Sequence, residues 1–354
     1  MTKLKEHKPS KIEALKAMTP ADRRRAIFDG IMNNAMFIII ALVIIYVAIK
    51  NPRFLSIPSL VNIISLTAAK LPIALGVGGC IILAGTDISA GRQVGLAACI
   101  SAGLQLTTNK LFPGLQILPI PVVLLCVLVA CAMVGFVNGF FMAKFKLHPF
   151  IVTLGTQLIL YTCLLLYVQQ GNNKGMAISN LDASYTNFVK GALFKIKGVP
   201  VPRYVLFAII LTAIMWFVWN KTTFGKNMFA LGSNEEAARV SGVNVFAVTI
   251  GVFALAGAMY GFTGFIEGAR VASNTANTGL NYELDAIAAC VIGGVSFVGG
   301  IGKIRGIVIG VLMLRLIFVG LLMVGVPQDL QYLIKGGIIL FACALDMRNY
   351  LVKK

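Results

Sequence analysis

The stretch PIPVVLLCVLVACAMVGFVNGFFMA, residues 119–143, runs for 25 residues without a charged side chain. About 20 mostly apolar residues make a helix long enough to cross the hydrocarbon core of a bilayer. The sequence contains ten such segments, and each is predicted to be a membrane-crossing helix. They cover residues 31–49, 59–84, 90–106, 119–143, 149–170, 203–219, 246–268, 283–298, 304–323 and 330–346.

The composition of the whole chain agrees with this prediction. Of its 354 residues 58% are hydrophobic and 12% are charged, whereas soluble domains have about 45–50% apolar and about 25% charged residues. An ordinary soluble enzyme, a disordered protein and a single-span receptor are therefore excluded. The long apolar blocks predict an all-α integral membrane protein of about ten transmembrane helices.

The second segment carries a charge and a proline in its middle, at Lys70-Leu71-Pro72. We expect a kink or a break there, because proline removes a helical hydrogen bond. A full break would give eleven helices instead of ten. Ten helices, with both termini in the cytoplasm, agree better with the rule that basic residues flank the cytoplasmic ends of membrane helices. They place on that side Lys144, Lys146, Lys221, Lys226, Arg239, Lys303, Arg305, Arg348, Lys353 and Lys354.

The segments divide the chain into a membrane domain and its flanking parts. Residues 1–30 are predicted to be a basic cytoplasmic tail without a cleavable signal peptide, and residues 347–354 a cytoplasmic C-terminal tail. Residues 31–346 form the transmembrane domain. Within it, residues 171–202 make the one long external loop and residues 220–245 a cytoplasmic loop.

Several kinds of chemistry are missing from the sequence. It has no phosphate-binding P-loop, no pairing of a nucleophile with a base, and only two histidines, so catalysis, ATP hydrolysis by this chain and a histidine-based metal site are not expected. The net charge of +18 could suggest nucleic acid. However, the basic residues lie mostly between apolar blocks, where they orient the chain in the membrane.

The cytoplasmic loop contains a short predicted helix. Ser233 and Glu236 have the spacing of a capping box, Glu235 and Arg239 that of an ion pair, and Gly242 suits a left-handed helix end. An isolated helix of two turns is marginal in water, so this helix requires a surface to dock on. That surface is either a partner protein, which makes this a coupling helix, or the membrane. The coupling candidates are Ser233, Asn234, Glu235, Glu236, Ala237, Ala238, Arg239 and Gly242.

Charged residues also occur within or beside the apolar segments. Charges at membrane depth are costly, and are usually paired or functional. Arg315 lies near the middle of its segment, so we expect a buried partner or a watery cavity around it. Structural pairing is one account of these charges and contact with a polar solute is the other. The charged candidates are Asp87, Arg92, Glu283, Asp285 and Arg315.

Small residues recur at four-residue spacing in the apolar segments. GxxxG pairs occur at Gly135/Gly139 and Gly257/Gly261, and again at 264/268 and 306/310. Small residues at this spacing let two helix backbones approach closely in lipid. We expect them to pack helices within one subunit.

Several of these segments, taken together, resemble the permease subunits of bacterial ABC sugar importers of the ribose/galactose type. They are residues 85–98, 149–155, 220–245, 282–297, 332–337 and 344–346. The run Ser89-Ala-Gly-Arg-Gln-Val-Gly95 resembles the galactoside branch of that family. The resemblance implies a multi-pass subunit of the bacterial inner membrane that translocates a monosaccharide similar to galactose or methyl galactoside.

The resemblance also implies partners. They are a second permease copy, a soluble extracytoplasmic sugar-binding protein, and a separate ATPase subunit with two nucleotide-binding domains. ATP and Mg²⁺ would bind to that ATPase, and this chain would bind no cofactor. A neutral sugar requires hydrogen-bonding groups along its path, and the candidates are Gln93, Asn138, Gln157 and Tyr161.

The sequence departs from the family pattern in its long basic tail, in residues 171–202 and in the charge at Arg315. Another pentose or hexose, or a nucleoside, therefore stays an alternative cargo. A stand-alone secondary carrier is the alternative class of transporter.

Overall fold

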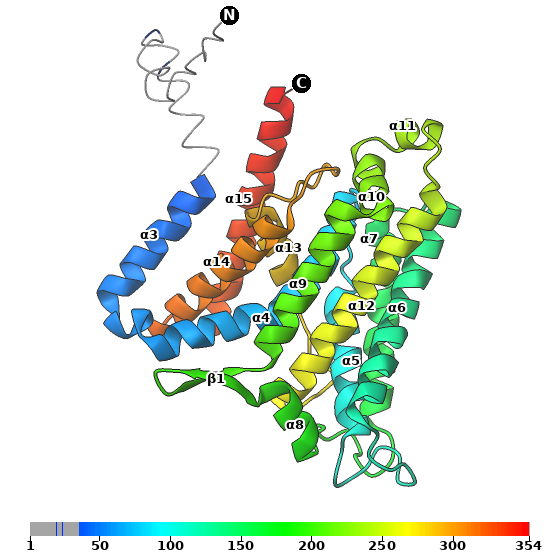
Figure 1. Cartoon of the computed structure of the whole chain (residues 1–354), viewed down its shortest axis with the longest axis vertical. Helices are drawn as coiled ribbons and strands as arrows, with labels where there is room; N and C mark the ends of the chain where they lie inside the picture. Colours follow the sequence, from blue (N-terminus) through cyan, green and yellow to red (C-terminus); the bar gives the residue numbers. More distant parts are fainter. Residues whose placement is uncertain (1–18, 20–22, 24–34, 354) are drawn as a thin grey trace, which may run out of the picture.

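The computed structural model describes residues 35–353 together with Thr19 and Arg23. Except for those two residues, the predicted N-terminal tail lies outside the described part. The chain forms an array of helices, with one small hairpin at the end of the molecule opposite to α11 (Figure 1).

Each of the ten predicted apolar segments contains a helix. The bounds are α3 Ala35–Lys50, α4 Ile57–Ile82, α5 Ala90–Leu104, α6 Ile120–Phe145, α7 Pro149–Val168, α9 Tyr204–Lys221, α12 Val245–Val271, α13 Tyr282–Ile292, α14 Ile304–Met323 and α15 Gln328–Lys353. Among the described residues six helices, α4, α6, α7, α9, α12 and α14, are long and apolar enough to cross a membrane. The helix α13 is shorter than predicted, and residues 293–303 after it are not helical.

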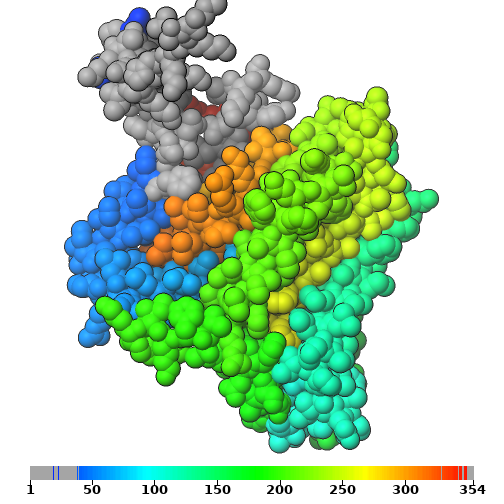
Figure 2. Space-filling model, viewed as in Figure 1, coloured from blue at the N-terminus to red at the C-terminus, as the bar shows by residue number. Residues whose placement is uncertain are grey.

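The helix α4 is continuous from Ile57 to Ile82, so of the expected kink or break at Lys70–Pro72 the break was wrong. The alternative of eleven helices, which required that break, is wrong for the same reason. A proline removes only one helical hydrogen bond, whereas α4 is buried along most of its length and contacts α9, α12, α13 and α14. Packing on several sides therefore holds the helix together through the proline. In the space-filling view α9, α12 and α14 form much of the visible surface, and α4 reaches it mainly near its first turns (Figure 2).

The GxxxG pairs of α6 and α12 pack these two helices against each other. A Cβ atom added to Gly139 would lie 2.7 Å from the Cα of Ile250, and one added to Gly261 would lie 2.7 Å from the carbonyl oxygen of Val127. At Gly135 and Gly257 it would overlap a carbonyl oxygen of the facing helix. The expectation that these glycines pack helices within one subunit is confirmed.

Residues 171–202 are more ordered than the predicted loop. They contain helix α8, Ala183–Lys190, and an antiparallel hairpin of β1, Ala192–Ile196, and β2, Val199–Pro202. Tyr185 anchors α8 on α12, because its ring is fully buried and its hydroxyl donates a hydrogen bond to the carbonyl of Phe265 at 2.6 Å. The turn of the hairpin is Lys197-Gly198, with both residues at positive φ, a conformation that glycine adopts without steric cost.

Candidate functional site

The predicted coupling helix exists, but its cap differs from the prediction. Helix α11 spans Glu235–Val240 and follows directly on α10, Thr223–Ser233. The N-cap is Asn234, whose side-chain oxygen accepts a hydrogen bond from the N–H of Ala237 at 3.0 Å. The predicted capping box was wrong because Ser233 ends α10, where its hydroxyl donates to the carbonyl of Phe229 at 2.9 Å. Asparagine is at least as good an N-cap as serine.

The other two features of this helix are confirmed. Arg239 and Glu235 form an ion pair at 2.7 Å, and Gly242 adopts φ +83°. Ala238 is buried, whereas the charged pair is exposed and Val240 is 88% exposed. The helix therefore presents an apolar side chain and two charges away from the rest of the chain, at one end of the molecule (Figure 1).

A groove of about 450 Å³ lies beside this helix. Glu235 and Arg239 line one side of it, and the turn from α6 to α7, with Lys146 and His148, lines another. Phe246, at the start of α12, adds an apolar wall. The groove can accept one or two side chains from a partner that docks on α11.

A buried polar cluster joins the loop after α4 to three helices. The backbone N–H and the hydroxyl of Ser89 both donate to Oδ1 of Asp87, at 2.9 and 2.6 Å. The side-chain amides of Gln93 on α5 and Asn138 on α6 donate to the hydroxyl oxygen of Ser89, at 3.0 and 3.2 Å. Thr156 on α7 donates to Asn138. Four of these side chains are fully buried, those of Asp87, Ser89, Gln93 and Asn138.

The structure therefore brings together three of the predicted path residues, Asp87, Gln93 and Asn138, and adds Ser89 and Thr156, which the sequence interpretation missed. The signal for Ser89 was its place two residues after an aspartate, where a side-chain turn commonly forms. Because these side chains bond to one another and are closed off from solvent, they lock α5, α6 and α7 to the loop.

Arg92 does not pair with Asp87. Its guanidinium donates to the carbonyl of Ala276 at 2.9 Å and lies over the ring of Tyr161, 4.3 Å from the centroid. Gln157 is one turn before Tyr161 on α7 and is half-buried. Glu283 faces the start of α5, where a side chain at Gly91 would overlap its carboxylate.

The contact with Ala276 belongs to a non-helical segment, residues 272–281, that runs along α5. The carbonyl of Thr275 accepts from the thiol of Cys99 at 3.4 Å, and Gly279 lies directly against Gly91. Thr275 and Asn277 are exposed. Irregular backbone inside a membrane is tolerated where it is buried in protein or lines a watery cavity. This segment, which the sequence interpretation also missed, therefore brings polar groups to a place where a path can pass.

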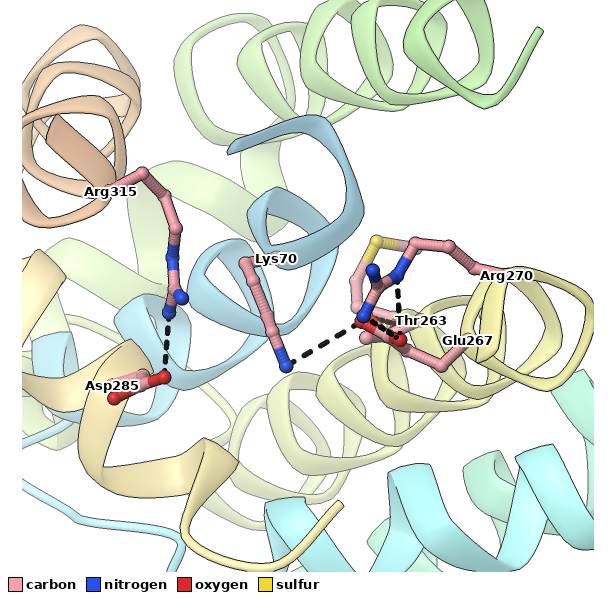
Figure 3. Close-up of polar contacts among 7 residues, drawn as sticks. Lys70, Thr263, Glu267, Arg270, Asp285 and Arg315 are labelled. Carbon is pink, nitrogen blue, oxygen red and sulfur yellow. Dashed lines mark hydrogen bonds and ion pairs between the residues drawn. The ribbon is translucent and has the colours of Figure 1, made fainter. Parts of the chain in front are cut away.

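A second set of charged residues lies between α4, α12, α13 and α14 (Figure 3), and Lys335 of α15 contacts it. Glu267 is fully buried and pairs with Lys70 at 3.5 Å and with Arg270 at 2.7 Å. Asp285 pairs with Arg315 at 2.6 Å and also with Lys335. The expected buried partner of Arg315 is thus Asp285. The predicted site residues did not include Lys70, Glu267, Arg270 and Lys335. The signal that could have identified them was a charge inside or beside an apolar segment.

Comparison with known proteins places the whole chain in one family. It is 42% identical over 330 residues to the galactose/methyl galactoside import permease protein MglC of Haemophilus influenzae, covering 92% of this chain and 97% of that protein. It is 42% identical over 335 residues to MglC of Escherichia coli, covering 94% and 98%. The ribose import permease protein RbsC of Bacillus subtilis is 33% identical over 329 residues, covering 93% and 97%.

No solved structure matches the chain significantly. The family model described as the permease component of the branched-chain amino acid transport system matches residues 59–343. Together with its apolar helices, this match makes the chain a multi-pass membrane protein and a transport component. The chain belongs to this family of transport-system permeases.

Proposed function

We propose that the chain is the membrane-spanning subunit of an ATP-driven importer for a monosaccharide of the galactose or methyl galactoside class. The observation that carries this proposal is the identity of 42–43% to relatives named galactose/methyl galactoside import permease, over 92–94% of this chain. Relatives named ribose import permease are 31–33% identical. A pentose is therefore the second candidate cargo.

We further propose ten membrane crossings with both termini in the cytoplasm of a bacterium, across its inner membrane. In Figure 1 the first turn of α3, the last turn of α15 and α10–α11 lie at one end, and α8 and β1 lie at the other. The basic residues Lys221, Lys226 and Lys303 are on elements that reach the α11 end, which favours that end as cytoplasmic. The short α13, about 16 Å long at 1.5 Å per residue, would cross together with the non-helical residues 272–281.

The ATPase subunit would dock on α11. A capped helix of six residues has little stability of its own, yet it is held outward with an exposed Val240 beside an exposed ion pair. Such an arrangement suits insertion into a cleft of another protein, with the groove next to α11 receiving side chains in return. ATP and Mg²⁺ would bind to that partner, which supplies the energy for transport.

The opposite end, with α8 and the hairpin, would face the soluble sugar-binding protein. A second copy of the chain would complete the path. Within one copy, the best-placed polar groups are those along residues 272–281, together with Arg92, Gln157 and Tyr161. The cluster around Asp87 and Ser89 is closed off from solvent by burial.

The decisive experiment measures uptake by the chain in proteoliposomes with its ATPase and binding protein. We expect ATP-dependent uptake of labelled galactose above ribose and a nucleoside. Uptake without the ATPase or ATP would instead indicate a secondary carrier and would overturn the proposal.

The docking of α11 is tested by exchanging its two charges in the variant E235R/R239E. The exchange keeps an ion pair and the net charge but inverts the pattern offered to a partner, and like charges facing each other at an interface cost several kcal/mol. We expect uptake and co-purification of the ATPase to fall about tenfold or more. The control variant Lys195→Glu, exposed on β1 at the opposite end, should keep co-purification of the ATPase. Unchanged association of E235R/R239E with the ATPase would contradict docking at α11.

A further inference from the structure

The positive and negative charges of the residues between α4 and α15 are unequal in number. Glu267 bridges Lys70 and Arg270, and Asp285 bridges Arg315 and Lys335. Four cations therefore share two carboxylates, which leaves two positive charges in excess. All of them lie on helices of the membrane domain, and Figure 3 shows them except for Lys335. An uncompensated charge is costly there.

Burial makes this excess significant. The side chain of Lys70 is 8% exposed, and those of Arg315 and Lys335 are 13% and 12% exposed. Aromatic rings offset a part of the charge, since Lys70 lies over the ring of Tyr282 and Lys335 lies 5.0 Å from the ring centroid of Tyr332. A ring face attracts a cation but carries no net charge, so the two excess charges remain.

The cations surround a cavity of about 230 Å³. Its lining includes Lys70, Arg270, Arg315 and Lys335, whereas Asp285 is the one carboxylate among the described lining residues. The Nε of Arg315 makes no hydrogen bond, and the ammonium nitrogen of Lys70 is paired with Glu267 at 3.5 Å without a hydrogen bond. One buried donor is thus without an acceptor, and a second is weakly held, on the wall of a cavity that carries excess positive charge.

Two other acidic residues, on α13 and in the first turn of α15, do not balance the charge. Asp329 of α15 is exposed and does not line the cavity. Glu283, two positions before Asp285 on α13, faces Gly91 of α5. It does not line the cavity. A ligand is therefore the remaining source of negative charge for this part of the structure.

We propose that this cavity binds a phosphate group. The donors of arginine match phosphate oxygens in geometry, and hydrogen bonds between charged partners are the strong ones. A phosphate carries one to two negative charges and would balance the excess, while accepting from Lys70 and Arg315. The group belongs either to the headgroup of an anionic phospholipid or to a phosphate-bearing solute. The inference does not depend on which sugar the protein transports.

The test is a binding experiment on the full-length protein, purified in a neutral detergent and freed of anionic lipid. Its melting temperature is measured against inorganic phosphate at constant ionic strength, and separately with phosphatidylglycerol or phosphatidylcholine added. Because a ligand that binds only the folded state raises its stability by RT ln(1 + [L]/Kd), we expect a melting temperature that rises with the logarithm of ligand concentration above Kd, for phosphate, for phosphatidylglycerol or for both. A rise with phosphatidylglycerol alone assigns the site to a lipid headgroup, and a rise with phosphate assigns it to a phosphate group accessible from water.

The double variant K70M/R315Q removes the two excess cations and leaves Glu267 with Arg270 and Asp285 with Lys335. It should fold and lose the response. If the double variant does not fold, R315Q alone should weaken phosphate binding about tenfold, the effect of one charge-assisted hydrogen bond. The matched control R305Q removes an exposed cation at the start of the same helix and should respond as the wild type does. No rise in wild type with either probe, or equal rises in wild type and in R315Q, would overturn the proposal.

Discussion

The close contact between α6 and α12 predicts that the substitution Gly139→Ala lowers the stability of the protein. The added Cβ would lie 2.7 Å from the Cα of Ile250 and 3.3 Å from the carbonyl oxygen of Thr249. An ordinary carbon contact begins at about 3.4 Å, so the two helices must separate by about 0.7 Å, and overpacking of this kind costs about 1–3 kcal/mol. The helix propensity of alanine returns about 0.5–1 kcal/mol. The net destabilisation should therefore be about 1–2 kcal/mol.

Two further variants calibrate this prediction. Gly135→Ala should cost more, because the added Cβ would overlap the carbonyl oxygen of Phe253, which belongs to the backbone and cannot rotate away. Gly155→Ala on α7 has nothing within 4 Å of the new atom, so it should be neutral or stabilising by up to about 1 kcal/mol. The assay is reversible unfolding of the purified protein in mixed micelles with increasing denaturing detergent. If Gly139→Ala and Gly135→Ala stabilise the protein as Gly155→Ala does, the two helices do not pack through these glycines.

Two other substitutions test the charged residues and the coupling helix. Glu267→Gln leaves Lys70 and Arg270 without their shared carboxylate, so it should destabilise the protein by about 3–5 kcal/mol. In the control Glu236→Gln the lost ion pair is 81% exposed on the glutamate side, so the free energy of unfolding in the same assay should change by less than about 0.5 kcal/mol. Equal effects of the two variants would contradict the buried role of Glu267. Asn234→Ala removes the cap of α11 and should weaken that helix by about 1 kcal/mol. Amide hydrogen exchange at Ala237 and Ala238 should therefore become about fivefold faster, while the global free energy of unfolding is unchanged. Unaltered exchange would show that the cap contributes nothing.

The positions of the long helices could be predicted because a membrane helix depends mainly on local composition. A run such as residues 119–143 has one stable form in lipid, with all backbone groups bonded within the segment. The prediction failed where tertiary packing overrides the local signal. Pro72 predicted a kink or a break, and neighbours on several sides keep α4 free of the break. Residues 293–298 were predicted to be helical, but α13 ends at Ile292, and Gly294, Gly299 and Gly300 after it adopt positive φ.

The candidate site was predictable in its residue types and less so in its pairings. Local spacing correctly predicted the Glu235–Arg239 pair, since both partners lie on one helix. Asp87 and Arg92 are also close in sequence, yet their partners come from elsewhere, Ser89 for the first and Ala276 with Tyr161 for the second. The pair of Arg315 with Asp285 joins two helices, and no spacing rule covers such a contact. A charge in an apolar segment predicts that a partner exists, but not which residue it is.

The α10–α11 segment connects to the charged residues through backbone contacts that a side chain would prevent. Gly232, next to the end of α10, lies against the carbonyl of Ile82 at the end of α4, and Gly300 donates its N–H to that same carbonyl at 2.8 Å. Because backbones in direct contact cannot yield as flexible side chains do, a displacement of α10–α11 by an ATPase would reach α4 with little loss. Lys70 lies on α4 and pairs with Glu267 of α12, so a shift of α4 along its axis would change that ion pair. The surface proposed for the ATPase and the ion pair of Lys70 are therefore joined by one continuous helix.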